Sequence, residues 1–304
     1  MIKKQPFFSV KRNVVLVAIF YTFLWGCAFP LVKLCMTSFG IDDTDNMSKC
    51  LVAGIRFFLS GVLTLLWCGL KEQDGVRIEK DKIAVVLWYG ILATALQYSF
   101  TYIGLSRMDG SKGAVFDQLC VFLVVLCSGF VFKHDKMTRQ KVIGCVLGFI
   151  GVILINIDGV NFKFSFSGEG IMFCAVLCQT ASYFVAKGSA GRMSAAKLVG
   201  YGQFVGGLLL ILFALLRGGS IAQVNTLAVI TLVMLALISS VAYVLSLMPL
   251  QYFLASEISS FNLLITLFGV IMSAVVLGEN IFKWNYGVSL LLITLGIFFI
   301  NKKR

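Results

Sequence analysis

The stretch that decides the fold runs from Leu105 to Asn156 and reads LSRMDGSKGAVFDQLCVFLVVLCSGFVFKHDKMTRQKVIGCVLGFIGVILIN. A shift of 145 residues places the segment from Leu250 to Asn301 on top of it without a gap. Identical residues meet at positions that include Leu105/Leu250, Phe116/Phe261, Ser128/Ser273, Leu147/Leu292, Gly151/Gly296, Ile155/Ile300 and Asn156/Asn301. Because apolar residues mostly face apolar residues between these anchors, the pattern indicates an internal repeat, which is typical of membrane proteins built by duplication.

The composition assigns the whole chain to the membrane. Hydrophobic residues make up 59% of the 304 residues and charged residues 13%, against about 25% charged in a soluble domain. The net charge of +12 would suggest a nucleic-acid partner in a soluble protein. Most basic residues here lie in short loops and tails, where they orient helices in the bilayer. The sequence therefore predicts an all-α integral membrane protein whose surroundings are lipid and which binds no nucleic acid.

Ten apolar segments are long enough to cross a bilayer, for which a helix needs about 20 residues. They are Val14–Ser38, Cys50–Leu70, Ile83–Leu105, Gly113–Phe132, Val142–Ile157, Gly170–Lys187, Leu198–Leu216, Leu227–Leu250, Ile258–Leu277 and Trp284–Ile300. The longest polar link, from Asp158 to Glu169, divides them into two groups of five. We therefore expect two repeats of five helices, residues 1–157 and 168–301. Since five is odd, the second repeat enters the membrane inverted relative to the first.

The orientation follows from the lysines and arginines on alternate sides. The side that holds both termini carries 18 of these residues and the other side carries 6. The first apolar run is too long for a signal peptide, so we interpret it as an uncleaved helix. The sequence predicts a multi-pass protein of the bacterial cytoplasmic (inner) membrane with both termini in the cytoplasm.

Catalytic and metal-binding patterns are missing from the sequence. The nine cysteines form no CxxC pair and fall in or beside apolar segments, where thiols behave as small hydrophobes. The single histidine, His134, lies in a loop and is not a metal site. The chain has no GxSxG elbow, P-loop or HExxH motif. We therefore expect a protein that is not an enzyme and carries no cofactor or metal.

Four short motifs occur in order along the chain. They are Phe23-Leu24-Trp25-Gly26-Cys27-Ala28-Phe29-Pro30, Gly54-Ile55-Arg56-Phe57-Phe58, Tyr102-Ile103-Gly104-Leu105 and Leu277-Gly278-Glu279. In order and spacing the chain resembles the drug/metabolite transporter superfamily, in its EamA-type, rhamnose-permease-like branch of ten-helix transporters. The resemblance implies transport of small metabolites, often efflux of amino acids, through a cavity lined by both halves.

The sequence departs from the pattern of that family in two places. His134-Asp135 stands where the first repeat of the family usually has a glutamate. The fourth and ninth predicted helices also lack the proline that often lies mid-helix there.

Two charged residues inside predicted helices need an explanation, because ionisable groups are costly in the bilayer. Arg56 lies about two turns inside the outer end of the second helix, or roughly 9 Å at 1.5 Å per residue. Asp117 lies one turn into the fourth helix, at a similar depth. Either the two form a structural ion pair, or Arg56 binds a substrate carboxylate while Asp117 positions it or carries a proton. Lys33, nearer the outer end of the first helix, is expected to extend to the outer surface.

The repeat connects some of these residues. Asp117 falls on Asn262 at the 145-residue shift, and Arg56 falls near Gln203. Polar positions repeated in both halves are expected along a substrate path, although helix–helix hydrogen bonds explain them equally well.

Further polar and aromatic residues lie within the predicted helices, and each is either a packing residue or part of the path. The substrate-binding candidates are Trp25, Arg56, Tyr98, Tyr102, Asp117, Gln118, Gln179, Tyr183 and Asn262, with Gln97 and Tyr243 as additional polar positions. Tyr98 and Tyr102 are four residues apart and share a helix face. The glycine sets Gly144/Gly148/Gly151 and Gly202/Gly206 predict tight helix contacts, within or between subunits.

The sequence therefore predicts a secondary transporter that exports a small-molecule substrate such as an amino acid. The driving ion, where one is used, is H⁺, since Asp117 is the one carboxylate well inside a predicted helix. The alternatives are an intramembrane enzyme acting on lipids and a small-solute channel.

Overall fold

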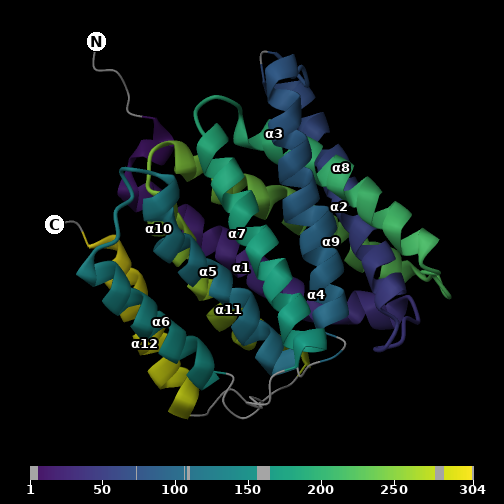
Figure 1. Cartoon of the computed structure of the whole chain (residues 1–304). Coiled ribbons are helices and arrows are strands. Elements are labelled where there is room, and N and C mark those ends of the chain that lie inside the picture. The colour runs from purple at the N-terminus through teal and green to yellow at the C-terminus, as the bar shows by residue number, and fades with distance from the viewer. Residues whose placement is uncertain are drawn as a thin grey trace.

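The computed structural model describes residues 6–72, 74–105, 107, 110–155, 165–277 and 284–302. Within these ranges the chain forms helices joined by turns (Figure 1). The elements are η1 (Phe7–Ser9), α1 (Lys11–Ser38), α2 (Asn46–Lys71), α3 (Lys80–Gly90), η2 (Ile91–Leu96), α4 (Gln97–Leu105), α5 (Gly110–Val131), α6 (Arg139–Ile155), η4 (Phe166–Gly170), α7 (Ile171–Ser189), α8 (Ala195–Leu216), α9 (Thr226–Leu247), η5 (Met248–Gln251), α10 (Ala255–Ser260), α11 (Leu263–Leu277) and α12 (Trp284–Asn301).

Eight helical spans among the described residues are long and apolar enough to cross a membrane. Several are composite: α3, η2 and α4 form one span, as do α10 and α11. The shorter helices α5 and α6 lie among them and complete the ten predicted crossings. The prediction of an all-α membrane protein with ten helices is confirmed, and most helix boundaries agree within a few residues.

Two of the predicted helices contain a break. The third changes to a π-helical turn, η2, over Ile91–Leu96. The ninth is interrupted at Phe261 and Asn262, between α10 and α11. Such irregular turns are frequent at functional sites, because they redirect the side chains that follow.

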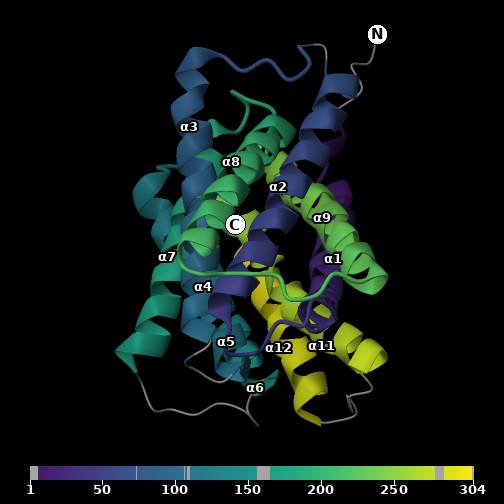
Figure 2. The same cartoon turned by 90° about the vertical axis from the view of Figure 1, so that its right-hand side faces the viewer.

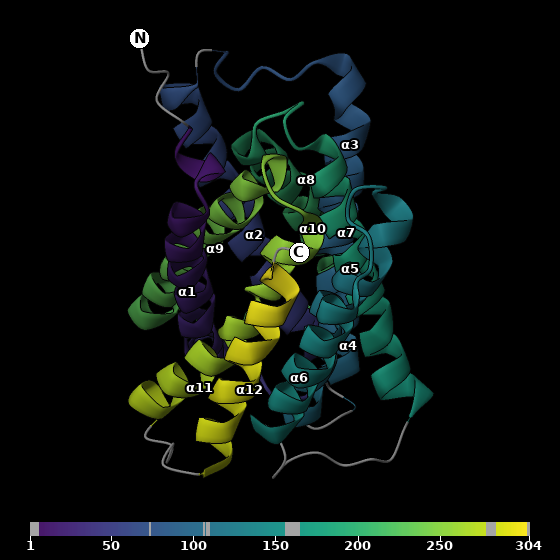
Figure 3. The ribbon, with the colours of Figure 1, turned by 90° about the vertical axis from the view of Figure 1, so that its left-hand side faces the viewer.

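The two groups of five helices pack as inverted equivalents. Helix α2 packs along its equivalent α8, and α6 packs along its equivalent α12. Figure 2 shows α2 crossing α8, with α3, α4 and α7 on one side and α1 and α9 on the other. Figure 3 shows α6 beside α12, flanked by α1 and α11 on one side and by α5 and α7 on the other. Each contact of α1 with α9 and α11 has a counterpart in the contacts of α7 with α4 and α5. A pseudo-two-fold axis therefore passes through both central pairs.

Glycines allow both central pairs to approach closely. A Cβ atom on Gly61 would lie 2.4 Å from the backbone nitrogen of Phe204 on α8, and one on Gly144 would lie 2.6 Å from the carbonyl oxygen of Gly296 on α12. The remaining glycines of the predicted sets also contact helices of the same chain: Gly148 contacts Leu263 and Phe122, Gly151 contacts Ile293, and Gly202 and Gly206 contact Gly90. The predicted tight contacts thus lie within one chain.

The helix ends define two faces. The Nζ atom of Lys11, at the start of α1, donates a hydrogen bond of 2.9 Å to the carbonyl oxygen of Asn301, at the end of α12. We call this side the N face. On the opposite face, Asn225 accepts from the backbone N–H of Ala228 to cap α9, and its amide nitrogen donates to the carbonyl oxygen of Ser38.

Candidate functional site

Arg56 is buried in the middle of the helix bundle. Because α2 begins at Asn46, Arg56 lies about 15 Å along the helix, deeper than the sequence indicates. Its side chain is 7% exposed, and its Nε donates a hydrogen bond of 2.8 Å to the Oγ of Ser239 on α9. The Ser239 hydroxyl in turn donates to the carbonyl oxygen of Leu235 at 2.8 Å. The proton of the Ser239 hydroxyl is therefore used in the bond to Leu235, and a lone pair on the same oxygen accepts from Arg56.

The rest of the guanidinium group has unused hydrogen-bonding capacity. Among the described residues, none accepts a hydrogen bond from either terminal nitrogen of Arg56, and none forms an ion pair with it within 4 Å. The ring of Phe57 lies 5.1 Å from the guanidinium carbon, within range of a cation–π interaction. A buried cation with two free donor groups is costly unless an anion joins it.

Phe57 belongs to a group of five aromatic rings that contact one another, and we call them the aromatic cluster: Trp25, Phe57, Tyr98, Tyr102 and Tyr243. Ring centroids lie 4.4 Å apart for Phe57 and Tyr98, 5.1 Å for Trp25 and Tyr243, and 6.4 Å for Tyr98 and Tyr102. The rings come from α1, α2, α4 and α9, so both halves of the chain contribute. The predicted shared face of Tyr98 and Tyr102 is consistent with this arrangement.

A tyrosine pair joins the two repeats at the centre of the cluster. The hydroxyl oxygens of Tyr98 and Tyr243 lie 3.0 Å apart and share a hydrogen bond. The two residues are 145 positions apart, which is the shift that relates the halves. Tyr98 and Tyr243 are therefore equivalent residues that meet across the pseudo-two-fold axis. The π-helical turn η2 ends one residue before Gln97 and so sets the direction of Tyr98.

We expect the single variants Tyr98→Phe and Tyr243→Phe each to lower stability, by about 1 kcal/mol, because each leaves the partner hydroxyl without its hydrogen bond. The double variant should cost no more than either single variant, since both hydroxyls are then gone. Thermal unfolding of the four proteins in the same detergent measures this coupling. Additive losses would show that the two hydroxyls act independently.

The predicted pair of Arg56 and Asp117 does not form in this structure. Arg56 bonds to Ser239 instead, and no described residue forms an ion pair or hydrogen bond with the Asp117 carboxylate. Asp117 lies on α5. Equal depth on two helices did not bring the charges together, because depth does not determine the direction in which each side chain points.

Several enclosed polar atoms have no hydrogen-bond partner among the described residues. They are Tyr21 Oη, Gln118 Oε1, Tyr183 Oη, Gln203 Nε2 and Asn262 Oδ1. Gln118, Tyr183 and Asn262 are predicted path residues. A buried group of this kind costs about 1–3 kcal/mol when it stays unsatisfied, so these positions favour water or a polar solute.

Both halves of the chain match one protein-family model. The model of the EamA-like transporter family matches residues 12–157 and 166–302. The chain belongs to the EamA-like transporter family. Each of the two matched segments contains one of the five-helix groups.

Relatives of this EamA-like chain are transporters by name. An uncharacterized transporter of Haemophilus influenzae is 26% identical over 67% of this chain and 68% of its own length. The uncharacterized transporter YvbV of Bacillus subtilis is 25% identical over 96% of this chain and 93% of its own length. A protein of known crystal structure, 15% identical, shares the fold with a TM-score of 0.79 over 95% of this chain and 96% of that one. This EamA-like protein is therefore a multi-pass membrane transporter.

The EamA-like sequence motifs converge in the structure. Trp25, Arg56, Phe57 and Tyr102 belong to three separate motifs, and all four lie in or beside the aromatic cluster. Ser239, which orients Arg56, and Tyr21, whose ring lies 5.5 Å from Trp25, belong to none of them. The 145-residue shift, applied to Tyr98, would have identified its partner Tyr243 from sequence.

The remaining candidates lie away from the cluster or outside the described contacts. Gln179 is half-buried on α7, and no described hydrogen bond joins its side chain to the cluster. Gln97 is buried and Lys33 is exposed, as expected of a side chain that extends to the surface. The described residues contain no group of three or more possible metal ligands. The end of the Leu277-Gly278-Glu279 motif falls outside the described residues.

Proposed function

We propose that this EamA-like protein is a secondary transporter that exports small organic metabolites with a carboxylate group, such as amino acids. Arg56 carries this proposal, because it is buried and, among the described residues, has two free donor groups and no acidic partner. A planar guanidinium binds a carboxylate through two parallel hydrogen bonds. Such a bond would supply the missing counter-charge whenever substrate is present.

The aromatic cluster supports an amino-acid-like substrate. The Phe57 ring faces the guanidinium, and the rings of Tyr98 and Tyr243 pack against Phe57. With Trp25 and Tyr102 they provide apolar surface and negative ring faces. Ring faces of this kind attract an ammonium group. The site therefore combines partners for both charged groups of an amino acid. Because the cluster is built from both halves, relative movement of the halves would open it to either side.

We further propose that the N face is cytoplasmic in a bacterial inner membrane. The 18 lysines and arginines expected on the side of the termini, against 6 on the other side, support this orientation. Export would then run from the N face to the opposite face.

Matched ligand pairs test the substrate class. Purified protein would be reconstituted in liposomes and assayed by counterflow with radiolabelled amino acids. Competition would use each acid beside its carboxamide and its decarboxylated amine. We expect the acids to compete and the two analogues that lack a carboxylate to be at least about tenfold weaker, because each lost charge-assisted hydrogen bond contributes about 1.5–3 kcal/mol. Equal competition by all three forms would contradict the assignment of Arg56.

Asp117 is the residue that we propose for proton coupling. Replacement by asparagine is expected to abolish accumulation driven by a pH gradient and to leave counterflow exchange intact, because exchange at equal pH needs no net proton movement. Both assays can be run on the same liposomes. Leu126→Ala, on an exposed position of α5, keeps the carboxylate and controls for disturbance of the helix. If Asp117→Asn still accumulates substrate in response to the gradient, Asp117 does not carry the proton.

A further inference from the structure

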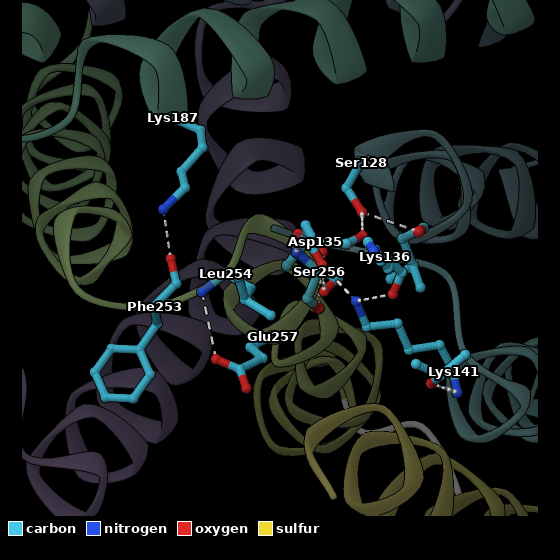
Figure 4. A network of polar contacts seen from close by, with 12 residues as sticks. Ser128, Asp135, Lys136, Lys141, Lys187, Phe253, Leu254, Ser256 and Glu257 are labelled. Atoms are coloured by element: carbon cyan, nitrogen blue, oxygen red, sulfur yellow. Dashed lines mark hydrogen bonds and ion pairs between the residues drawn. The ribbon is translucent and has the colours of Figure 1, made fainter. Parts of the chain in front are cut away.

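A buried polar cluster holds the N face together away from the aromatic cluster. Asp135 lies on the connection between α5 and α6 and is 1% exposed. Its carboxylate accepts hydrogen bonds from Lys141 Nζ, from the Ser256 hydroxyl and, at 3.0 Å, from the Ser256 backbone N–H (Figure 4). Lys141 Nζ also donates to the carbonyl oxygen of Lys136 at 3.0 Å. We call Asp135, Lys141 and Ser256 the N-face lock.

The lock joins the two halves of the protein. Asp135 and Lys141 belong to the first half, whereas Ser256 lies in the first turn of α10 in the second half. The free N–H groups at the start of a helix favour a carboxylate. Asp135 therefore needs both Lys141 and Ser256. Lys141 neutralises the charge of the carboxylate, and the backbone N–H of Ser256 donates to its second oxygen.

A second set of bonds holds the same connection from the other side. Lys187, at the end of α7, donates to the carbonyl oxygens of Leu250 and Phe253 at 2.5 and 2.6 Å. Glu257 accepts from the backbone N–H of Leu254 at 3.3 Å. Figure 4 shows Lys187 reaching down to the turn that leads into α10, while Asp135 and Lys141 approach α10 from the opposite side. The start of α10 is thus clamped between α7 and the α5–α6 connection.

Enclosed polar atoms lie next to both the aromatic cluster and the lock. Trp25 contacts both Tyr243 and Tyr21. Tyr183 packs against a buried cluster that includes Ala255, the residue before Ser256 in α10. Because the enclosed hydroxyls of Tyr21 and Tyr183 have no hydrogen-bond partner among the described residues, both positions suit water or a polar solute.

The repeat relates this lock to the sequence between α11 and α12. At the 145-residue shift Ser256 corresponds to Ser111, which is the same residue type. Asp135 corresponds to Asn280, and Lys141 corresponds to Tyr286. Glu279 and Lys283 lie one and three positions before these two residues, so the sequence of the second half also carries a carboxylate and a lysine in this connection. Asn280 lies outside the described residues, so this comparison is made from the sequence alone.

We propose that the N-face lock is the gate on that side, and that its buried charge pair stabilises the state closed at the N face. Loss of a contact that is made in one of two alternating states shifts the population toward the other state. Asp135 and Lys141 favour the state in which they are bonded to α10. The proposal does not depend on which solute is carried.

Hydrogen–deuterium exchange on the full-length protein without substrate tests the gate. Lys141→Met removes the neutralising charge. We expect exchange in the segment 250–262 to rise by about tenfold, and exchange on the opposite face in the segment 217–226 to fall, because the population moves to the state closed there. Lys136→Met removes a neighbouring charge whose side chain is exposed and makes no lock contact. It should leave both segments unchanged.

Two further variants keep the test decisive if Lys141→Met does not fold. Ser256→Ala removes one hydrogen bond and retains all charges, and it should produce the same opposite changes with smaller size. The charge-swapped double variant Asp135→Lys/Lys141→Asp should not restore the wild-type pattern, because a lysine at 135 cannot accept from the Ser256 N–H. Increased exchange at the N face alone, no change at either face, or rescue by the swap would each overturn the proposal.

Discussion

Replacing Arg56 with glutamine is expected to remove the binding of carboxylate substrates and to leave the substrate-free protein at least as stable as the wild type. The guanidinium is buried with one side-chain hydrogen bond and no acidic partner within 4 Å among the described residues. Removal of such a charge relieves a desolvation cost. Ser239 keeps its bond to the Leu235 carbonyl oxygen and is not left unsatisfied.

The loss of affinity should be large. Two charge-assisted hydrogen bonds to a carboxylate contribute about 1.5–3 kcal/mol each, so we expect at least about a hundredfold weaker binding. Thermal unfolding with and without substrate measures both quantities in one experiment. The wild type should be stabilised by the substrate found in the counterflow assay, and Arg56→Gln should unfold at the same temperature with or without it.

Two control variants separate charge from orientation. Lys33→Gln removes an exposed charge from α1 and should bind substrate normally. Ser239→Ala keeps the Arg56 charge and removes the acceptor that orients it, so it should weaken binding by a smaller factor, about tenfold for one hydrogen bond. If Arg56→Gln lowers the unfolding temperature without substrate, Arg56 stabilises the fold and the carboxylate assignment is wrong.

Much of the fold could be predicted from sequence because the bilayer restricts the choices. Backbone groups inside lipid must be bonded within a helix, so apolar length alone locates the crossings. The repeat then gives the inversion. The breaks at Ile91–Leu96 and at Phe261–Asn262 could not be predicted, because a π-helical turn or a kink depends on packing with neighbouring helices and leaves no fixed residue signature.

The candidate site was predicted in part. Trp25, Arg56, Tyr98 and Tyr102 do meet, since motifs and helix periodicity place them on inward faces. The partner of Arg56 was not predictable, because a serine in an apolar helix usually bonds to its own backbone and attracts no notice. Ser239 does so as well, and only the structure shows that the same oxygen also accepts from Arg56.

The crossing of α2 and α8 leads to the second large prediction. A Cβ atom on Gly207 would lie 2.4 Å from the backbone nitrogen of Phe58 and 2.9 Å from the carbonyl oxygen of Gly54. Both contacts are with backbone, which cannot rotate away. Gly207→Ala should therefore push α8 from α2 and lower stability by about 1–3 kcal/mol, the usual cost of overpacking.

Gly287→Ala provides a control of opposite sign. Gly287 lies in α12, and a Cβ atom there would meet nothing within 4 Å. Alanine is a better helix former than glycine by about 1 kcal/mol, so this variant should be neutral or more stable. Thermal unfolding of both variants in the same detergent makes the comparison.

Because α2 also carries Arg56, Gly207→Ala should weaken substrate binding in the protein that still folds, whereas Gly287→Ala should not. Equal unfolding temperatures for the two variants would mean that α2 and α8 can separate at little cost, and the close crossing at the pseudo-two-fold axis would then not be what holds the halves together.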